Sequence, residues 1–144
     1  MKIAIGCDHA GYELKEQLKK YLQELNHEVL DQGCYSLDSV DYPVFGFKVG
    51  EAVANKEVDY GVVVCGSGIG ISIAANKVKG VRCANVFVDD HARLARLHNN
   101  ANVIAFGARF LSFEQASHML KIFLETEFEG NRHCKRVDLL DQYK

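Results

Sequence analysis

The sequence lacks the features that mark several large classes of protein. Its 144 residues hold a single proline, no linker, no low-complexity tract and no internal repeat, which favours one domain over residues 1–144. No apolar run approaches the roughly 20 residues that a membrane-spanning helix needs. The formal net charge is −2, so we expect no broad basic face and no binding to nucleic acid or to a membrane surface.

The five cysteines lack the spacing of two common cysteine sites. Their number is odd and no C-x-x-C pair is present, which fits neither a disulfide framework nor a zinc site. We therefore expect no metal, and we expect free thiols in a reducing compartment. Residues 1–5 enter a strand pattern without signal-peptide architecture, so the sequence predicts a cytoplasmic protein.

Short apolar runs alternate with helical patterns along the whole chain. Strands are expected at residues 2–6, 28–31, 60–65, 82–86 and 102–106. The segments between them carry apolar residues at helical spacing, and Leu25, Leu94 and Leu140 are among those expected on buried faces. Ser112 and Gln115 have the spacing of a capping box. The alternation predicts an α/β fold, a three-layer αβα sandwich with a Rossmann-like, doubly wound sheet of about five parallel strands.

The most informative segment ends the third expected strand. A run of valines leads into Cys65, and the glycines Gly66, Gly68 and Gly70 follow within five residues. In a parallel sheet this places a thiol at the edge where ligands bind. A glycine-rich turn that opens a helix presents amide groups to an anion, and the Ser67 hydroxyl adds a donor. Cys65 is therefore a candidate nucleophile or general base, beside a candidate oxyanion site.

The same loop has a second interpretation as a dinucleotide-binding turn. The glycine spacing is G-x-G-x-G, Ile71 occupies the last required glycine position, and the motif follows the third strand instead of the first. Asp89 keeps this interpretation open, because it lies near the end of the next strand, where an acidic residue would bind a ribose hydroxyl. A P-loop signature is absent, which argues against nucleoside triphosphate chemistry.

Polar residues near other expected strands add candidates. Asp8 and His9 follow the first strand, where Asp8 is either a helix cap or a ligand-binding group. His98, Asn99 and Asn100 lie between a helix and the last strand, and three adjacent polar residues there favour a site over a simple helix end.

Basic residues supply a candidate anion clamp. Arg132 and Arg136 are four residues apart and lie either on a solvated charged face or around a phosphate, with Arg109 at a strand end as a further candidate. A base, an oxyanion loop, a histidine and arginines, without a metal or cofactor motif, predict cofactor-free proton transfer. The expected substrate is a small phosphorylated carbonyl compound.

Several motifs occur in the order found in a known family. They are Gly6-Cys7-Asp8-His9-Ala10-Gly11, Asp41-Tyr42-Pro43, residues 65–77 beginning with Cys65-Gly66-Ser67-Gly68, His98-Asn99-Asn100-Ala101-Asn102-Val103 and Gly130-Asn131-Arg132-His133. On these motifs the chain resembles the ribose-5-phosphate isomerase B family. This family belongs to a group of sugar-phosphate isomerases that also holds galactose-6-phosphate isomerase subunits. The resemblance runs nearly from end to end.

The resemblance implies an aldose–ketose isomerase of the pentose phosphate pathway. Such an enzyme interconverts ribose 5-phosphate and ribulose 5-phosphate through an enediolate, without metal or cofactor. The resemblance assigns proton transfer between C2 and C1 to Cys65 and help in opening the furanose ring to His98, with Ser67 and Asp8 as further catalytic groups. Ser67 stands where many relatives have threonine, and it retains the hydroxyl. The implied substrate contacts are Asp8, His9, Gly66, Ser67, Gly68, Ile69, Gly70, Asn99, Arg109, Arg132 and Arg136.

The resemblance also implies a homodimer, alone or as a dimer of dimers, whose sites take residues from both chains. The Cys-Gly-Ser-Gly and Gly-x-Arg-His patterns occur together on this chain, which favours a self-sufficient enzyme over a subunit that needs a different partner chain. An isomerase of allose 6-phosphate or galactose 6-phosphate remains an alternative. So does a non-catalytic sensor of a phospho-metabolite or nucleotide.

Overall fold

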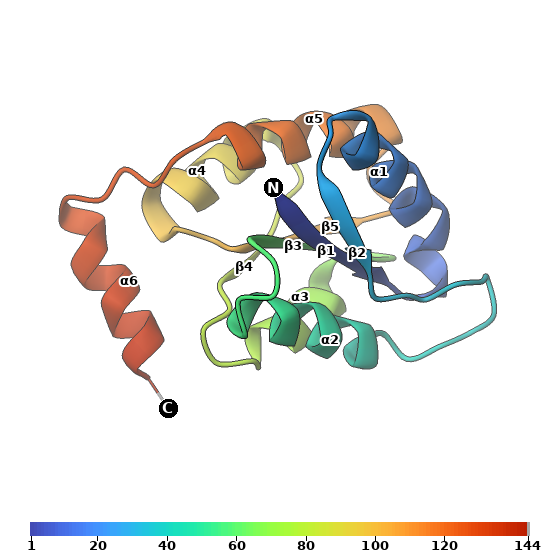
Figure 1. The fold of residues 1–144 in the computed structure, drawn as a ribbon, viewed down its shortest axis with the longest axis horizontal. Coiled ribbons are helices and arrows are strands. Elements are labelled where there is room, and N and C mark those ends of the chain that lie inside the picture. The colour runs from blue at the N-terminus through green and yellow to red at the C-terminus, as the bar shows by residue number, and fades with distance from the viewer. Residues whose placement is uncertain (144) are drawn as a thin grey trace.

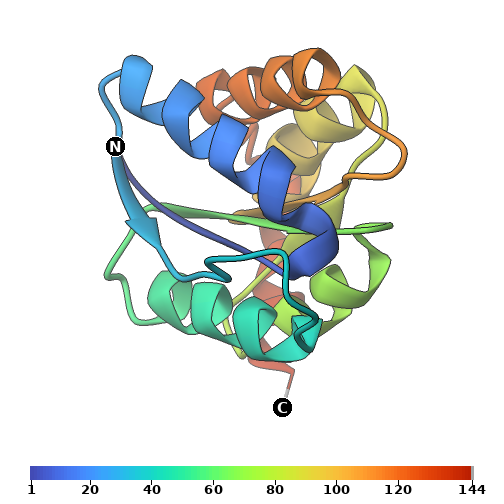
Figure 2. The same cartoon turned by 90° about the vertical axis from the view of Figure 1, so that its right-hand side faces the viewer.

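The computed structural model describes residues 1–143 and arranges them as two layers of helices around one parallel sheet (Figures 1 and 2). The elements in chain order are β1 (Lys2–Cys7), the 3-10 turn η1 (His9–Gly11), α1 (Tyr12–Glu24), β2 (Glu28–Asp31), α2 (Tyr42–Ala54), β3 (Tyr60–Cys65), α3 (Ile69–Asn76), β4 (Cys83–Asn85), α4 (Asp89–Asn99), β5 (Val103–Gly107), α5 (Phe113–Glu125) and α6 (Arg132–Gln142). Within these residues, no helix has the length and apolar character to cross a bilayer.

The strand order is β2-β1-β3-β5-β4, and every neighbouring pair is parallel. The predicted αβα sandwich with a Rossmann-like sheet of five parallel strands is therefore confirmed. The predicted strand bounds hold for β2 and β3. The edge strand β4 is shorter than predicted, because it pairs with β5 only over Cys83–Asn85.

Alternate residues of the central strands contribute to two separate cores. Val62 and Val64 pack with residues of α1, α4 and α5, whereas Val63 and Cys65 pack with residues of α2 and α3. Successive side chains of a strand point to opposite faces, so the valine run fills both cores at once. Cys65 therefore reaches the end of β3 on the face covered by α2 and α3.

Two glycines allow α2 and α3 to lie close together. A Cβ added to Gly46 would lie 2.8 Å from the Cβ of Ala74, and one added to Gly50 would lie 3.3 Å from the carbonyl oxygen of Ala75. Extra side-chain volume in a packed interior forces its neighbours to shift. The helix pair α2 and α3 packs against the strand that carries Cys65, and the close spacing of the two helices requires glycine at positions 46 and 50.

The last helix, α6, stands apart from the three layers and contacts α4 (Figure 1). Its Val137 is buried, but Leu140 is exposed, contrary to the prediction. Leu25 and Leu94, also expected to be buried, are exposed at the end of α1 and on the outer side of α4. Helical periodicity identifies an apolar face but does not show whether another element covers it.

Candidate active site

The carboxyl ends of β1, β3 and β5 meet at one edge of the sheet, as predicted. The N–H of Asp8 donates to the carbonyl of Val64 at 3.2 Å, and the N–H of Arg109 donates to the carbonyl of Gly66 at 3.0 Å. We call Asp8, His9, residues 65–70 and Arg109 the carboxyl-edge cluster. β2 lies on one side of β1, and β3, β5 and β4 lie on the other side, so the order in which strands are added changes direction between β1 and β3. Ligands of doubly wound sheets bind at such a point.

Cys65 is buried at the start of the glycine loop. The N–H of Gly68 donates to its Sγ at 3.2 Å, and α3 begins at the next residue, Ile69. An amide aimed at a sulfur atom and a helix N-terminus both stabilise negative charge there. Gly68 has a φ of 80°, and a Cβ at this position would lie 2.4 Å from Oδ1 of Asn85. The geometry of the thiol therefore depends on glycine at position 68.

Ser67 and Asp8 each use a side-chain oxygen to hold a turn. Oγ of Ser67 accepts from the N–H of Ile69 at 3.1 Å, a bond that leaves the hydroxyl proton free to donate. Oδ1 of Asp8 accepts from the N–H of Gly11 at 3.1 Å. The helix-cap interpretation of Asp8 is thus correct for one oxygen, and a functional role would fall to the other.

A backbone hydrogen bond holds His9, and two side chains lie against the glycine loop. Nδ1 of His9 accepts from the N–H of Val40 at 3.1 Å, which places the proton of the neutral imidazole on Nε2. The guanidinium of Arg109 covers Gly66, where an added Cβ would lie 2.7 Å from Nη1. The ring of Tyr42 lies against the loop at Gly70 in the same way, 2.7 Å from such a Cβ. We did not predict Tyr42 at the site, because no spacing rule connects the start of α2 with this loop.

The remaining predicted residues lie at the opposite edge of the sheet. His98 and Asn99 end α4, which runs antiparallel to the strands, and the carbonyl of Asn102 accepts from the N–H of Gly61 at the start of β3 at 2.9 Å. β5 is five residues long, so the two edges are separated by about 15 Å. Figure 2, which looks from the right-hand side of Figure 1, shows α6 behind the sheet. One chain therefore does not bring His98, Arg132 or Arg136 to Cys65.

We call His98, Asn99, Glu129, Arg132, His133 and Arg136 the amino-edge cluster. The rings of His98 and His133 are stacked, with centroids 4.3 Å apart and planes at 15°. Nε2 of His98 lies 3.9 Å, and Nε2 of His133 lies 3.7 Å, from Oε2 of Glu129. Burial lowers the pKa of His133, and the nearby charges of Arg132 and His98 lower it further, while Glu129 acts in the opposite direction.

His98, Glu129 and His133 could also be considered as metal ligands, since their ligand atoms all lie within 4.8 Å of one another. Imidazole binds a metal in the plane of its ring, and the planes of two stacked, nearly parallel rings meet only far from both rings. One ring would have to turn before both could bind one ion. The arrangement as it stands suits hydrogen bonding to a carboxylate or a substrate better than metal binding.

Comparison with known proteins assigns the chain to a family. A family model described as Ribose/Galactose Isomerase matches residues 3–140. The chain belongs to this family. Ribose-5-phosphate isomerase B of Escherichia coli (strain K12) is 44% identical over 139 residues, which cover 96% of this chain and 93% of the relative.

Two solved structures of ribose-5-phosphate isomerase B have the same fold. The Clostridium thermocellum protein gives a TM-score of 0.97 at 46% identity, covering 99% of this chain and 96% of that one. The Mycoplasma genitalium protein, solved with bound ribulose-5-phosphate, gives a TM-score of 0.95 at 40% identity, covering 99% and 95%. The membership of this chain in the Ribose/Galactose Isomerase family, stated above as a resemblance, is thus confirmed.

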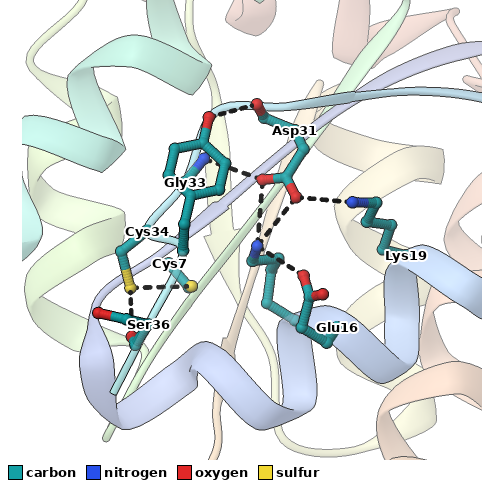
Figure 3. Close-up of polar contacts among 9 residues, drawn as sticks. Cys7, Glu16, Lys19, Asp31, Gly33, Cys34 and Ser36 are labelled. Carbon is teal, nitrogen blue, oxygen red and sulfur yellow. Dashed lines mark hydrogen bonds and ion pairs between the residues drawn. The ribbon is translucent and has the colours of Figure 1, made fainter. Parts of the chain in front are cut away.

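In this member of the Ribose/Galactose Isomerase family, an ion network around one buried lysine holds the loop after β2 beside the carboxyl edge (Figure 3). Nζ of Lys15, which is fully buried, lies 3.0 Å from Oδ2 of Asp31 and 2.7 Å from Glu16, and Lys19 also pairs with Asp31 at 3.0 Å. Burial alone would raise the pKa of Asp31, but hydrogen bonds from the Gly33 N–H, Lys15 and Lys19 lower it overall.

The position of Asp89 weakens the dinucleotide interpretation. Asp89 follows β4, and β5 lies between β4 and the strand that carries the glycine loop. Oδ1 of Asp89 lies 3.1 Å from Nδ1 of His118. In dinucleotide-binding folds the ribose-binding acid follows the strand next to the glycine turn. Asp89 is one strand too far from the loop for that role.

Proposed function

We propose that this chain interconverts ribose 5-phosphate and ribulose 5-phosphate through an enediolate, without metal or cofactor, and that Cys65 is the base. The observation that carries the proposal is the thiol of Cys65 in the β1–β3 crevice, with the N–H of Gly68 aimed at its Sγ at 3.2 Å. Family membership and the ribulose-5-phosphate bound by the Mycoplasma genitalium relative support the choice of substrate.

The geometry suggests how the proton transfer proceeds on the open-chain aldose. Cys65, as thiolate, takes the proton from C2, whose electron pair forms a double bond to C1 while O1 becomes negatively charged. The amides of the glycine loop and the Ser67 hydroxyl are placed to stabilise this oxyanion. The thiol then returns the proton to C1, and the proton of O2 passes to O1, which leaves the carbonyl at C2.

We also propose a homodimer in which each site combines the carboxyl-edge cluster of one chain with the amino-edge cluster of the other. The separation of the clusters by about 15 Å within one chain supports this arrangement. Ile69 and Ile73 of α3 are exposed next to the glycine loop, and a cavity of about 620 Å³ lies between α6 and the α3–β4 connection. Such surfaces are typical of a contact between subunits.

In this dimer, Arg132 and Arg136 bind the substrate phosphate and His98 acts on the sugar ring, with Asn99 beside it. Arginine suits this role, because its planar group donates two parallel hydrogen bonds to phosphate oxygens. Asp8, His9 and Arg109 contact the substrate from the other chain.

Measuring ketose formation from ribose 5-phosphate tests the proposal. Cys65→Ala should lower kcat by about 100-fold or more, because general bases contribute on that order. Cys134→Ser, which alters an exposed thiol on α6, is the matched control and should retain wild-type activity. A residual rate within about tenfold of wild type in Cys65→Ala would exclude Cys65 as the base. The same assay with allose 6-phosphate and galactose 6-phosphate identifies the preferred sugar.

We propose the cytoplasm as the location of the protein. All five cysteines are free, including Cys7 and Cys34, whose Sγ atoms lie only 3.8 Å apart (Figure 3). Neighbouring thiols remain reduced in a compartment of low redox potential.

A further inference from the structure

One carboxylate oxygen lies in front of two stacked imidazoles. Oε2 of Glu129 is 3.9 Å from Nε2 of His98 and 3.7 Å from Nε2 of His133. His133 is nine-tenths buried, and its Nε2 has no hydrogen-bond partner among the described residues. A small movement of the Glu129 side chain would bring it into hydrogen-bond contact with either ring.

The backbone holds Glu129 at this place. Its N–H donates to the carbonyl of Leu97 at 3.1 Å, and Leu97 directly precedes His98 in the sequence. Gly130 and Asn131 then take positive φ values of 75° and 53°, which turn the chain into α6. This turn sets the ring of His133 against that of His98. The carboxylate and both rings are therefore positioned by the loop between α5 and α6.

The charges around His98 give Glu129 a specific role. Arg132 Nη1 lies 3.9 Å from Oε1, the other oxygen of Glu129, and Arg136 adds a second positive charge nearby. Burial and these cations lower the pKa of His133, which keeps that ring neutral near pH 7. Glu129 thus faces the positive charge that His98 carries when it is protonated, and the neutral His133 ring supports the His98 ring from one side.

We propose that Glu129 is a positioning residue for ring opening: it orients the imidazole of His98 and balances its charge when it is protonated. This inference rests on the proposed isomerase function. In ring opening the C1–O4 bond of the furanose breaks, and its electron pair stays on O4. O4 takes the proton of His98, while O1 loses its proton, to Asp8 of the opposing cluster, as the C1 carbonyl forms.

Ribulose 5-phosphate allows ring opening to be measured apart from the proton transfer at carbon. It is acyclic, because the oxygen on C5 that would close a furanose carries the phosphate. Exchange of its C1 proton with D2O therefore requires Cys65 and the glycine loop but no ring step. Conversion of ribose 5-phosphate requires both. The two rates, measured by NMR and by ketose formation on the full-length protein, separate the two functions.

Glu129→Gln should lower kcat for ribose 5-phosphate about tenfold and leave C1 exchange of ribulose 5-phosphate within about twofold. His98→Asn should show the same pattern with a larger loss. Glu129→Asp, which keeps the charge, should recover part of the lost activity. Glu127→Gln is the matched control: Glu127 is exposed, precedes Glu129 by two residues, and forms no ion pair within residues 1–143.

Two results would overturn the role of Glu129. An equal fall of both rates in Glu129→Gln would indicate a general structural defect, and an unchanged kcat would show that the carboxylate is not needed. A wild-type protein without either activity, or a Cys65→Ala protein with normal C1 exchange, would instead contradict the isomerase proposal itself. The failure of one proposal is thus distinguishable from the failure of the other.

Discussion

The two edges of the sheet are constructed in different ways. At the carboxyl edge two contacts of buried groups are short: Gly68 N lies 3.2 Å from Cys65 Sγ, and Lys15 Nζ lies 3.0 Å from Asp31 Oδ2. At the amino edge the corresponding contacts of Glu129 are 3.7–3.9 Å long, and most of the side chains are partly exposed. The carboxyl edge is therefore complete within one chain. The longer and partly exposed contacts of the amino edge agree with the proposed dimer, in which a second chain would cover them.

The largest expected difference between the two edges is in how much a substitution at each lowers the free energy of unfolding. Asp31→Asn leaves the buried ammonium of Lys15 with Glu16 as its remaining ion-pair partner, and breaking a buried pair costs about 3 kcal/mol. Glu129→Gln at the amino edge should cost less than about 0.5 kcal/mol, because its contacts are partly exposed. Urea unfolding of both variants provides the comparison. Equal losses would show that the two edges are equally rigid.

The Asp31 effect should depend on pH in a defined direction. Folding lowers the pKa of this carboxyl, so its contribution is complete above the unfolded-state value of about 4. It is lost as the pH falls through the lower folded-state value. The gap in unfolding free energy between wild type and Asp31→Asn should therefore be constant near neutral pH and shrink below about pH 4. A gap that widens in acid would contradict the ion-pair assignment.

Mixing two inactive variants tests whether the edges act across chains. Cys65→Ala and His98→Asn should each lose about 100-fold in activity on ribose 5-phosphate. A hybrid dimer would hold one site with both native groups, so a randomly reassembled equimolar mixture should recover about one quarter of the wild-type rate. If unfolding and refolding the two together restores nothing, although refolded wild type is active, the sites are not shared between chains.

A smaller effect is expected for the proposed phosphate contact of Arg132 at the amino edge. Arg132→Ala should raise KM for ribose 5-phosphate about tenfold, the value of a charged hydrogen bond, and leave the slow turnover of free ribose unchanged. Arg93→Ala removes another exposed arginine, one that pairs with Asp90 on α4, and should change neither substrate. An equal loss with both sugars would make Arg132 a structural residue.

The sequence allowed prediction of the carboxyl edge because strand and loop signals are local. The valine run, the glycine spacing after Cys65 and the Ser112–Gln115 capping box all have the predicted structure. Tyr42 and Glu129 were missed because their contacts depend on tertiary packing. The proximity of Glu129 to His98 depends on the turn at Gly130 and Asn131, and no periodic pattern encodes that turn. The exposure of Leu140 has the same origin, since periodicity does not identify the covering surface.

The close contact of α2 and α3 helps to fix the position of the glycine loop relative to the Cys65 sulfur, although the residues of that contact lie outside both clusters. Cys65 belongs to the core on that side of the sheet, and α3 opens with the loop whose amide contacts its sulfur. A single methyl group at Gly46, which touches no substrate, would push α3 outward from α2. The same displacement would carry the glycine loop away from the sulfur. The contact between the Cys65 sulfur and the glycine loop therefore depends on α2, a helix that begins more than twenty residues earlier in the chain.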